Sequence, residues 1–143
     1  MEKELLNTFN KELLLKDLCA RLPYNVICQV EFRESGKYQS KSMFLSGVFT
    51  DEAYFTTESG SIYSNEYKPY LFPLSSMTDE QEEEYNDLNC YELGCFPHTE
   101  EALDYLIKNH FDYRGLIEKE LAIDATNLNI YWLWQEKRKY ITN

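Results

Sequence analysis

The chain has 143 residues, of which 43% are hydrophobic and 15% aromatic, enough to form the core of one domain spanning residues 1–143. Its 25 Asp and Glu residues outnumber its 14 Lys and Arg residues, for a net charge of −11. This excess argues against direct nucleic-acid binding, which needs clustered cations, but is compatible with a basic protein partner.

We expect a cytoplasmic protein with no membrane association. The N-terminal MEKELL lacks the apolar run of a signal peptide, and no stretch approaches the roughly 18 apolar residues of a membrane span. Four widely spaced cysteines, Cys19, Cys28, Cys90 and Cys95, fit a reducing compartment.

Residues 2–21 are predicted to form a helix that Pro23 ends. Its apolar residues recur roughly on one face: Leu5, Leu6, Phe9, Leu13, Leu14, Leu18 and Cys19. We expect this face to pack on the domain. An alternative stays open, in which residues 1–10 form an extension whose apolar side contacts a partner.

An antiparallel meander of three or four strands is predicted next. Residues 25–33 alternate between apolar and polar side chains, and residues 42–50, 53–57 and 62–67 supply further short strands. Gly36 and Gly60 each follow a serine between two strands, a composition typical of tight turns.

The segment KPYLFPLSSMTDEQEEEYNDL, residues 68–88, changes from strand-like to helix-like sequence. Pro69 and Pro73 favour an extended conformation between them, lying across the core. Thr78 and Gln81 have the spacing of a capping box, which predicts a helix beginning at Thr78.

A second short helix is predicted from Thr99 to about Asn109, before a turn at Gly115. Residues 116–125 fit either a helical turn or a strand, and residues 128–134 either a late strand or a docked tail. Whether residues 126–143 pack on the domain or act as an interaction arm is left open. The fold class is therefore α+β.

The negative charge is local. Residues 69–107 contain ten acidic residues and no Lys or Arg, which leaves a net charge of −1 for the rest of the chain. We expect a non-enzymatic protein that binds a basic protein partner through acidic residues of this region: Asp79, Glu80, Glu83, Glu84, Asp87, Glu100, Glu101 and Asp104.

Other interpretations of the acidic region stay open. A charge run is most often a solvated, solubilising face. Calcium binding is less favoured, because no loop has the alternating Asp/Asn pattern with a central Gly. A self-assembling structural component is a further alternative. No phosphate-binding or dinucleotide motif is present, and no cofactor is expected.

Two clusters of residues could bind a metal ion or catalyse a reaction. Cys90, Cys95 and His98, with His110 beyond them, offer zinc ligands, although their spacing matches no common zinc finger, and we expect no metal. His110, Asp112 and Arg114 would supply acid–base groups to a small hydrolase or nuclease. In the favoured structural interpretation, Asp112 accepts backbone N–H groups and Arg114 pairs with a carboxylate of the acidic region.

Three segments resemble an uncharacterised family of small acidic proteins from phages and mobile elements of gut anaerobes: KDLCARLPY at 16–24, KPYLFPLSSMT at 68–78 and HFDYRGLI at 110–117. They cover about a fifth of the chain. Phe72 stands where the family leads us to expect arginine, and Tyr105 where it leads us to expect tryptophan. The resemblance implies no catalytic residue; it implies an accessory protein that binds host machinery.

Overall fold

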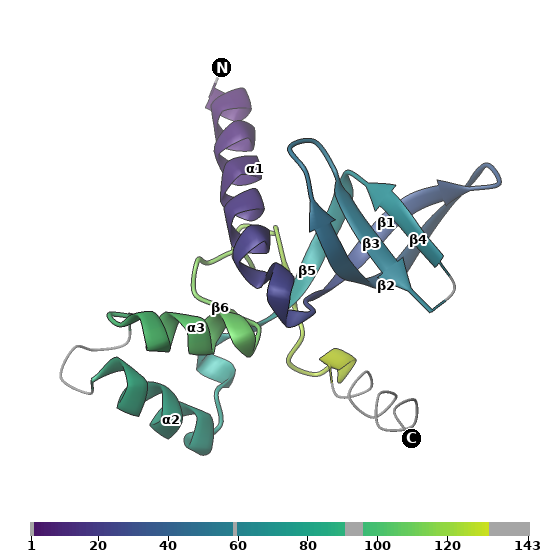
Figure 1. Cartoon of the computed structure of the whole chain (residues 1–143). Coiled ribbons are helices and arrows are strands. Elements are labelled where there is room, and N and C mark those ends of the chain that lie inside the picture. The colour runs from purple at the N-terminus through teal and green to yellow at the C-terminus, as the bar shows by residue number, and fades with distance from the viewer. Residues whose placement is uncertain (1, 59, 91–95, 132–143) are drawn as a thin grey trace.

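The computed structural model describes residues 2–58, 60–90 and 96–131. It has the predicted α+β architecture: an N-terminal helix, a mostly antiparallel sheet and two further helices (Figure 1). No helix in these ranges is both long enough and apolar enough for a membrane span.

Helix α1 (Glu2–Arg21) has the predicted bounds, and Pro23 lies in the following short 3-10 helix η1 (Leu22–Tyr24). Its C-terminal half packs on the sheet, whereas its N-terminal half projects away from the rest of the molecule (Figure 1). The expectation that the apolar face packs on the domain along the whole helix is wrong for the N-terminal half, because the sheet does not extend beneath it. The position of this half matches the alternative, in which the N-terminal residues form an extension.

Strands β1 (Ile27–Glu34), β2 (Lys37–Val48), β3 (Ala53–Thr57) and β4 (Gly60–Ser64) form the predicted meander, each pairing antiparallel with the next. Ser35 and Gly36 both have positive φ, at 54° and 78°, as a two-residue turn of type I′ requires. This tight turn lets β2 begin at Lys37, earlier than the predicted Ser42.

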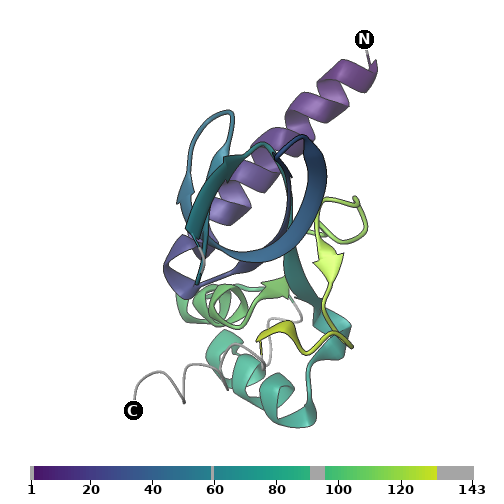
Figure 2. The ribbon, with the colours of Figure 1, turned by 90° about the vertical axis from the view of Figure 1, so that its right-hand side faces the viewer.

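The predicted strand 62–67 is wrong as a single element, because the chain leaves β4 at Ser64 and enters β5 (Glu66–Pro73). Strand β5 contains the predicted extended segment and pairs with β1, which gives the sheet order β4-β3-β2-β1-β5-β6. Only Asn65 separates β4 from β5, although three strands lie between them in the sheet. The sheet therefore curls into a partial ring (Figure 2).

The main core fills the concave side of this curled sheet. Helix α1 contributes Leu18, and the turn after β6 contributes Leu116. The buried members of the cluster are Leu18, Val26, Cys28, Val30, Met43, Leu45, Ala53, Phe55, Leu71, Leu116 and Ala122. Burying these side chains is the main favourable term in folding.

After β5, the 3-10 helix η2 (Leu74–Ser76) leads into α2 (Asp79–Asn89) and α3 (Glu100–Lys108). Strands β6 (Phe111–Asp112) and β7 (Ile123–Asp124) both pair parallel with β5. The ambiguous segment 116–125 is thus a turn followed by a short strand, and Gly115 has the expected positive φ of 74°.

Helix α3 ends at Lys108, one residue from the predicted end at about Asn109, and β6 separates it from the turn at Gly115. The end of the chain differs more from prediction. Ile130 and Tyr131 are helical where a late strand was one expectation, and residues 132–134 of that segment lie outside the described residues.

Candidate interaction surface on the acidic helices

Local sequence sets where both acidic helices begin. The Thr78 hydroxyl accepts a hydrogen bond from the Gln81 backbone N–H (3.1 Å), and the Gln81 side chain accepts one from Thr78 N–H (3.0 Å). Thr99 caps α3 in the same way, accepting from Ala102 N–H (3.0 Å). Both predicted caps are confirmed. Asp79 and Glu100 follow them directly, where carboxylates favour the positive end of the helix dipole.

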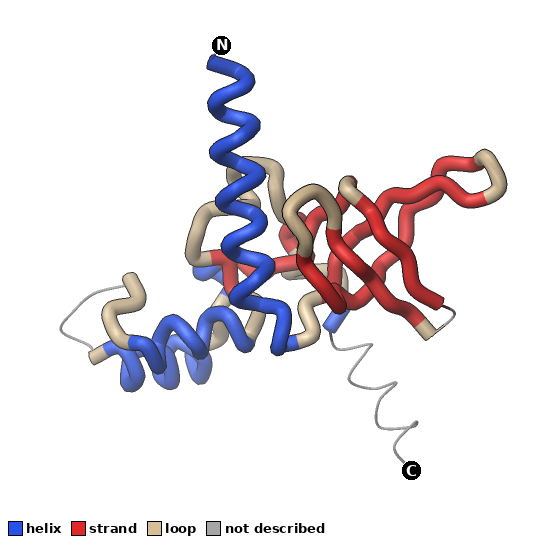
Figure 3. The backbone as a smooth tube through the Cα atoms, turned by 45° about the horizontal axis from the view of Figure 1, so that its top comes forward, coloured by secondary structure: helices blue, strands red, loops and turns tan. Residues whose placement is uncertain are grey.

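Helices α2 and α3 form an antiparallel hairpin on the side of the molecule away from the N-terminus (Figures 1 and 3). Tyr85 from α2 and Ala102 and Leu106 from α3 are buried together with Phe111. The Tyr85 and Tyr105 rings are 6.3 Å apart. This small second core holds the two helices against the end of the sheet.

Polar contacts join α2 to the beginning of α3. Asn89 is 1% exposed, and its amide donates to the Phe96 carbonyl (2.5 Å) and accepts from His98 N–H (2.6 Å). The Thr99 hydroxyl donates to the Leu88 carbonyl (2.7 Å). These contacts fix the relative position of the two helices.

We call the outward carboxylates of α2 and α3 the acidic face. All eight predicted partner-binding residues are exposed on it: Asp79, Glu80, Glu83, Glu84, Asp87, Glu100, Glu101 and Asp104. Among the described residues, the ion pairs within 4.0 Å involve only Asp17, Arg21 and Arg114, so none of the described cations pairs with a carboxylate of this face.

The acidic face destabilises its own helix. Asp79 and Glu83, Glu80 and Glu84, and Glu83 and Asp87 are like-charge pairs four residues apart, each costing about 0.2–0.5 kcal/mol. Within the hairpin, the Tyr105 hydroxyl donates to Glu84 (2.9 Å). Burial, together with this hydrogen bond, raises the pKa of Tyr105 to about 12.

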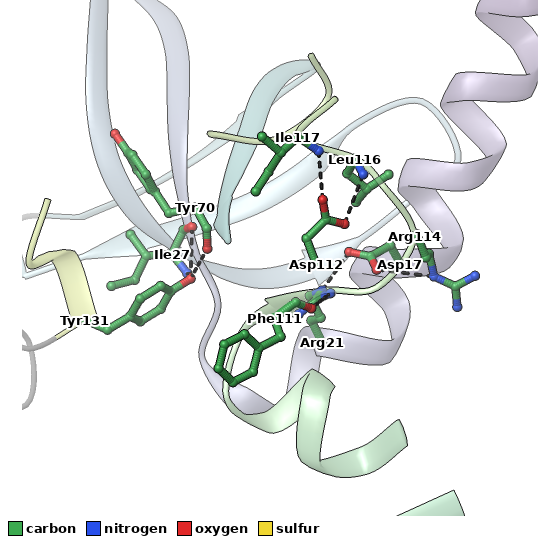
Figure 4. Close-up of polar contacts among 10 residues, drawn as sticks. All are labelled: Asp17, Arg21, Ile27, Tyr70, Phe111, Asp112, Arg114, Leu116, Ile117 and Tyr131. Atoms are coloured by element: carbon green, nitrogen blue, oxygen red, sulfur yellow. Dashed lines mark hydrogen bonds and ion pairs between the residues drawn. The ribbon is translucent and has the colours of Figure 1, made fainter. Parts of the chain in front are cut away.

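His110, Asp112 and Arg114 lie at the junction of α1, β5 and β6 rather than on the acidic face. Figure 4 shows Asp112 and Arg114 there. Asp112 is 8% exposed and accepts hydrogen bonds from Leu116 and Ile117 N–H, both at 2.9 Å. Arg114 pairs with Asp17 of α1 (3.3 Å), not with the acidic region as predicted, because α1 passes directly beside it. The prediction that Asp112 accepts backbone N–H groups is confirmed. The prediction that Arg114 pairs with a carboxylate of the acidic region is wrong.

Asp17 and Arg21 form the centre of this junction, and sequence analysis did not single them out. Both side chains are fully buried, and Arg21 Nε lies 2.7 Å from Asp17 Oδ2. Arg21 Nη2 also donates to the Phe111 carbonyl (2.6 Å), which ties α1 to β6 (Figure 4). Their spacing of four residues on a helix was the available signal, but it does not distinguish a buried pair from an exposed one.

The rest of the junction is aromatic. The His110 ring stacks on the Tyr131 ring, with centroids 3.8 Å apart, and Arg114 lies over the Tyr113 ring at 4.7 Å. The Tyr131 hydroxyl accepts from Ile27 N–H (3.0 Å) and donates to the Tyr70 carbonyl (2.7 Å). Residues 125, 130 and 131 therefore pack on the domain.

Three segments noted in the sequence, 16–24, 68–78 and 110–117, meet here. Segment 16–24 contributes Asp17 and Arg21, segment 68–78 contributes Tyr70 and Phe72, and segment 110–117 contributes the residues from His110 onward. Their shared location is a packing junction between helix and sheet.

Replacing Arg114 tests whether this junction is structural. We expect Arg114→Ala to lower the free energy of unfolding by about 1 kcal/mol, because Asp17 loses a partner and Tyr113 loses a stacked cation. Urea unfolding monitored by circular dichroism measures the change, with Arg33→Ala in the exposed part of β1 as the control. Unchanged stability combined with loss of a biological activity would instead support the acid–base interpretation of His110, Asp112 and Arg114.

Three of the four candidate zinc ligands lie within the described residues. Cys90 and His98 are exposed, His110 is in the junction, and Cys95 lies outside the described residues. Among the residues that are described, no group of three or more His, Cys, Asp or Glu side chains could hold a metal ion. Cys19, Cys28 and Cys90 are free thiols, and burial of Cys28 raises its pKa.

The fold and this surface define a small α+β protein in which an acidic helical hairpin, without ion pairs to the described residues, is attached to a curled sheet. No family model matches the chain, and the searches of curated proteins and of solved structures found no similar protein.

Proposed function

We propose that this protein is a non-enzymatic binding protein whose acidic face contacts a basic protein partner. The observation that carries the proposal is the exposure of all eight predicted carboxylates on one helical hairpin, with no ion pair to any of them among the described residues. A lysine- or arginine-rich surface would remove the like-charge repulsion within α2 and form charge-assisted hydrogen bonds with these carboxylates.

The placement of the charges supports this role over a general solubilising one. Glu80, Glu83 and Asp87 follow the spacing of one helical stripe on α2, while Glu101 and Asp104 lie on the neighbouring helix. A concentrated field of one sign steers oppositely charged partners and speeds their association. The same field repels nucleic-acid phosphates, which makes a basic protein the favoured partner.

The resemblance to small phage and mobile-element proteins suggests where such a partner is found. An accessory protein of this kind would act by binding a component of the host machinery. The acidic face would then compete for a site that the host component uses for another acidic ligand.

Charge reversal tests the acidic face directly. We expect the triple variant Glu80→Lys/Glu83→Lys/Asp87→Lys to lose capture of the partner in a pull-down from host lysate. Glu84 is left unchanged because it accepts the Tyr105 hydrogen bond. Capture by the natural chain should weaken strongly between about 0.1 M and 1 M salt, as the Debye length falls from about 10 Å to about 3 Å.

The matched control is Glu34→Lys/Glu52→Lys/Glu58→Lys, which makes the same overall charge change at three exposed positions on the meander. It should retain capture. Equal capture by both triple variants would show that the acidic face is not the binding surface. Equal loss would show a dependence on net charge without a specific site.

A further inference from the structure

Apolar side chains are exposed on the projecting half of α1. Leu5 is 71% exposed, and Leu6 and Phe9 are each 58% exposed, although Leu18 on the same helix is fully buried. Phe9 neighbours both leucines on the helix surface, because it lies three residues after Leu6 and four after Leu5. Such a cluster on a helix that extends beyond the sheet has no partner within the described part of its own chain (Figure 1).

We propose that this face of α1 binds the same face of a second copy of the chain, with the two helices antiparallel. This inference is independent of the proposed function of the acidic face.

The charges of α1 favour a second copy of the chain as the partner that covers its apolar face. Residues 2–21 contain four acidic and four basic residues, so α1 is neutral although the chain carries −11. Two acidic proteins can therefore approach each other through α1 without the repulsion that the acidic face would cause. A basic partner, in contrast, would be drawn to the acidic face.

The order of residues along α1 favours the antiparallel arrangement. Glu2, Phe9 and Lys16 are seven residues apart, which places them nearly in line on the helix surface, and all three are exposed. In an antiparallel pair centred on Phe9, Glu2 of each copy lies level with Lys16 of the other, and Leu5 lies level with Leu13. A parallel pair would instead place Glu2 beside Glu2 and Lys16 beside Lys16.

The position of the acidic hairpin supports the same arrangement. Helices α2 and α3 lie beyond the C-terminal end of α1, opposite the projecting N-terminus (Figure 1). An antiparallel pair places the bodies of the two copies at opposite ends of the paired helices, which keeps the two acidic faces far apart. Both acidic faces stay free to bind.

Sedimentation analysis of the full chain from about 1 µM to 1 mM tests the proposal, because an interface smaller than the standard size dissociates in this range. We expect the natural chain to pass from monomer to dimer. Phe9→Glu should raise the dissociation constant at least about tenfold, because each dimer loses the aromatic contact at its centre. Circular dichroism and thermal unfolding of this variant should match the natural chain, since Phe9 is exposed in the monomer.

Charge exchange tests the arrangement of the helices. Glu2→Lys should weaken the dimer because each Lys16 then faces a lysine, and the double variant Glu2→Lys/Lys16→Glu should restore it. A natural chain that stays monomeric over the whole range overturns the proposal, as does a dimer that Phe9→Glu leaves unchanged. A dimer that the double variant fails to restore overturns the antiparallel arrangement.

Discussion

Replacing Asp17 by Asn is expected to lower the free energy of unfolding by about 3–5 kcal/mol, the usual cost of removing one partner from a buried ion pair. Asp17 and Arg21 are both 0% exposed, and Arg114 also pairs with Asp17. Loss of the carboxylate charge leaves the Arg21 guanidinium buried beside Arg114 without a counter-charge. Since a domain of this size is stable by only about 5–15 kcal/mol, this loss is a large fraction of its total stability.

Urea unfolding measures this effect, with Glu12→Gln as the matched control. Glu12 is an exposed carboxylate on the same helix, and removing its charge should change stability by less than about 0.5 kcal/mol. The double variant Asp17→Asn/Arg21→Met should be destabilised by less than the sum of the two single variants, because it leaves no buried Arg21 charge. Similar stability of Asp17→Asn and Glu12→Gln would show that the pair contributes little.

Acidification below pH 6.5 is expected to destabilise the fold through His110. Burial, with a smaller effect of the nearby Arg21 charge, lowers the pKa of His110 from 6.5 to about 4. Between these values the unfolded chain binds a proton that the folded chain does not. The stability is fully present above pH 6.5 and is lost progressively as the pH falls to about 4, by about 3 kcal/mol in all.

The variant His110→Asn isolates this contribution. Asn does not titrate in this range, and it tolerates the left-handed backbone at this position, where φ is 65°. Loss of the stacking on Tyr131 should destabilise the variant at every pH, but its stability should fall less steeply than that of the natural chain between pH 6.5 and 4. His98→Asn, at the exposed second histidine, should keep the natural pH dependence; equal slopes for all three proteins would contradict the prediction.

Local sequence was sufficient for much of the fold. The bounds of α1, the Thr78 and Thr99 caps and the four-strand meander follow from interactions within a few residues. A capping box or a two-residue turn satisfies its own backbone groups, so it forms wherever the sequence places it. The exposure of the acidic residues could also be predicted from local sequence, because these carboxylates have no nearby cation in the sequence to pair with.

Long-range packing decided what the sequence left undetermined. The division of residues 62–67 between β4 and β5 depends on the pairing of β5 with β1, on the far side of the curled sheet. The pairing of β1 with β5 joins residues about 40 positions apart in the chain, so it forms only when distant segments meet.

For this protein, then, the sequence alone determined the positions of the three helices and of most meander strands, the α+β class and the concentration of negative charge in residues 69–107. Only the tertiary structure decided which apolar and charged side chains are buried. Leu5 and Leu18 look equivalent in the sequence of α1, as do Glu12 and Asp17, yet one of each pair is exposed and the other is buried. The difference arises because the sheet and β6 cover only the C-terminal half of α1, and that coverage depends on contacts between residues far apart in the chain.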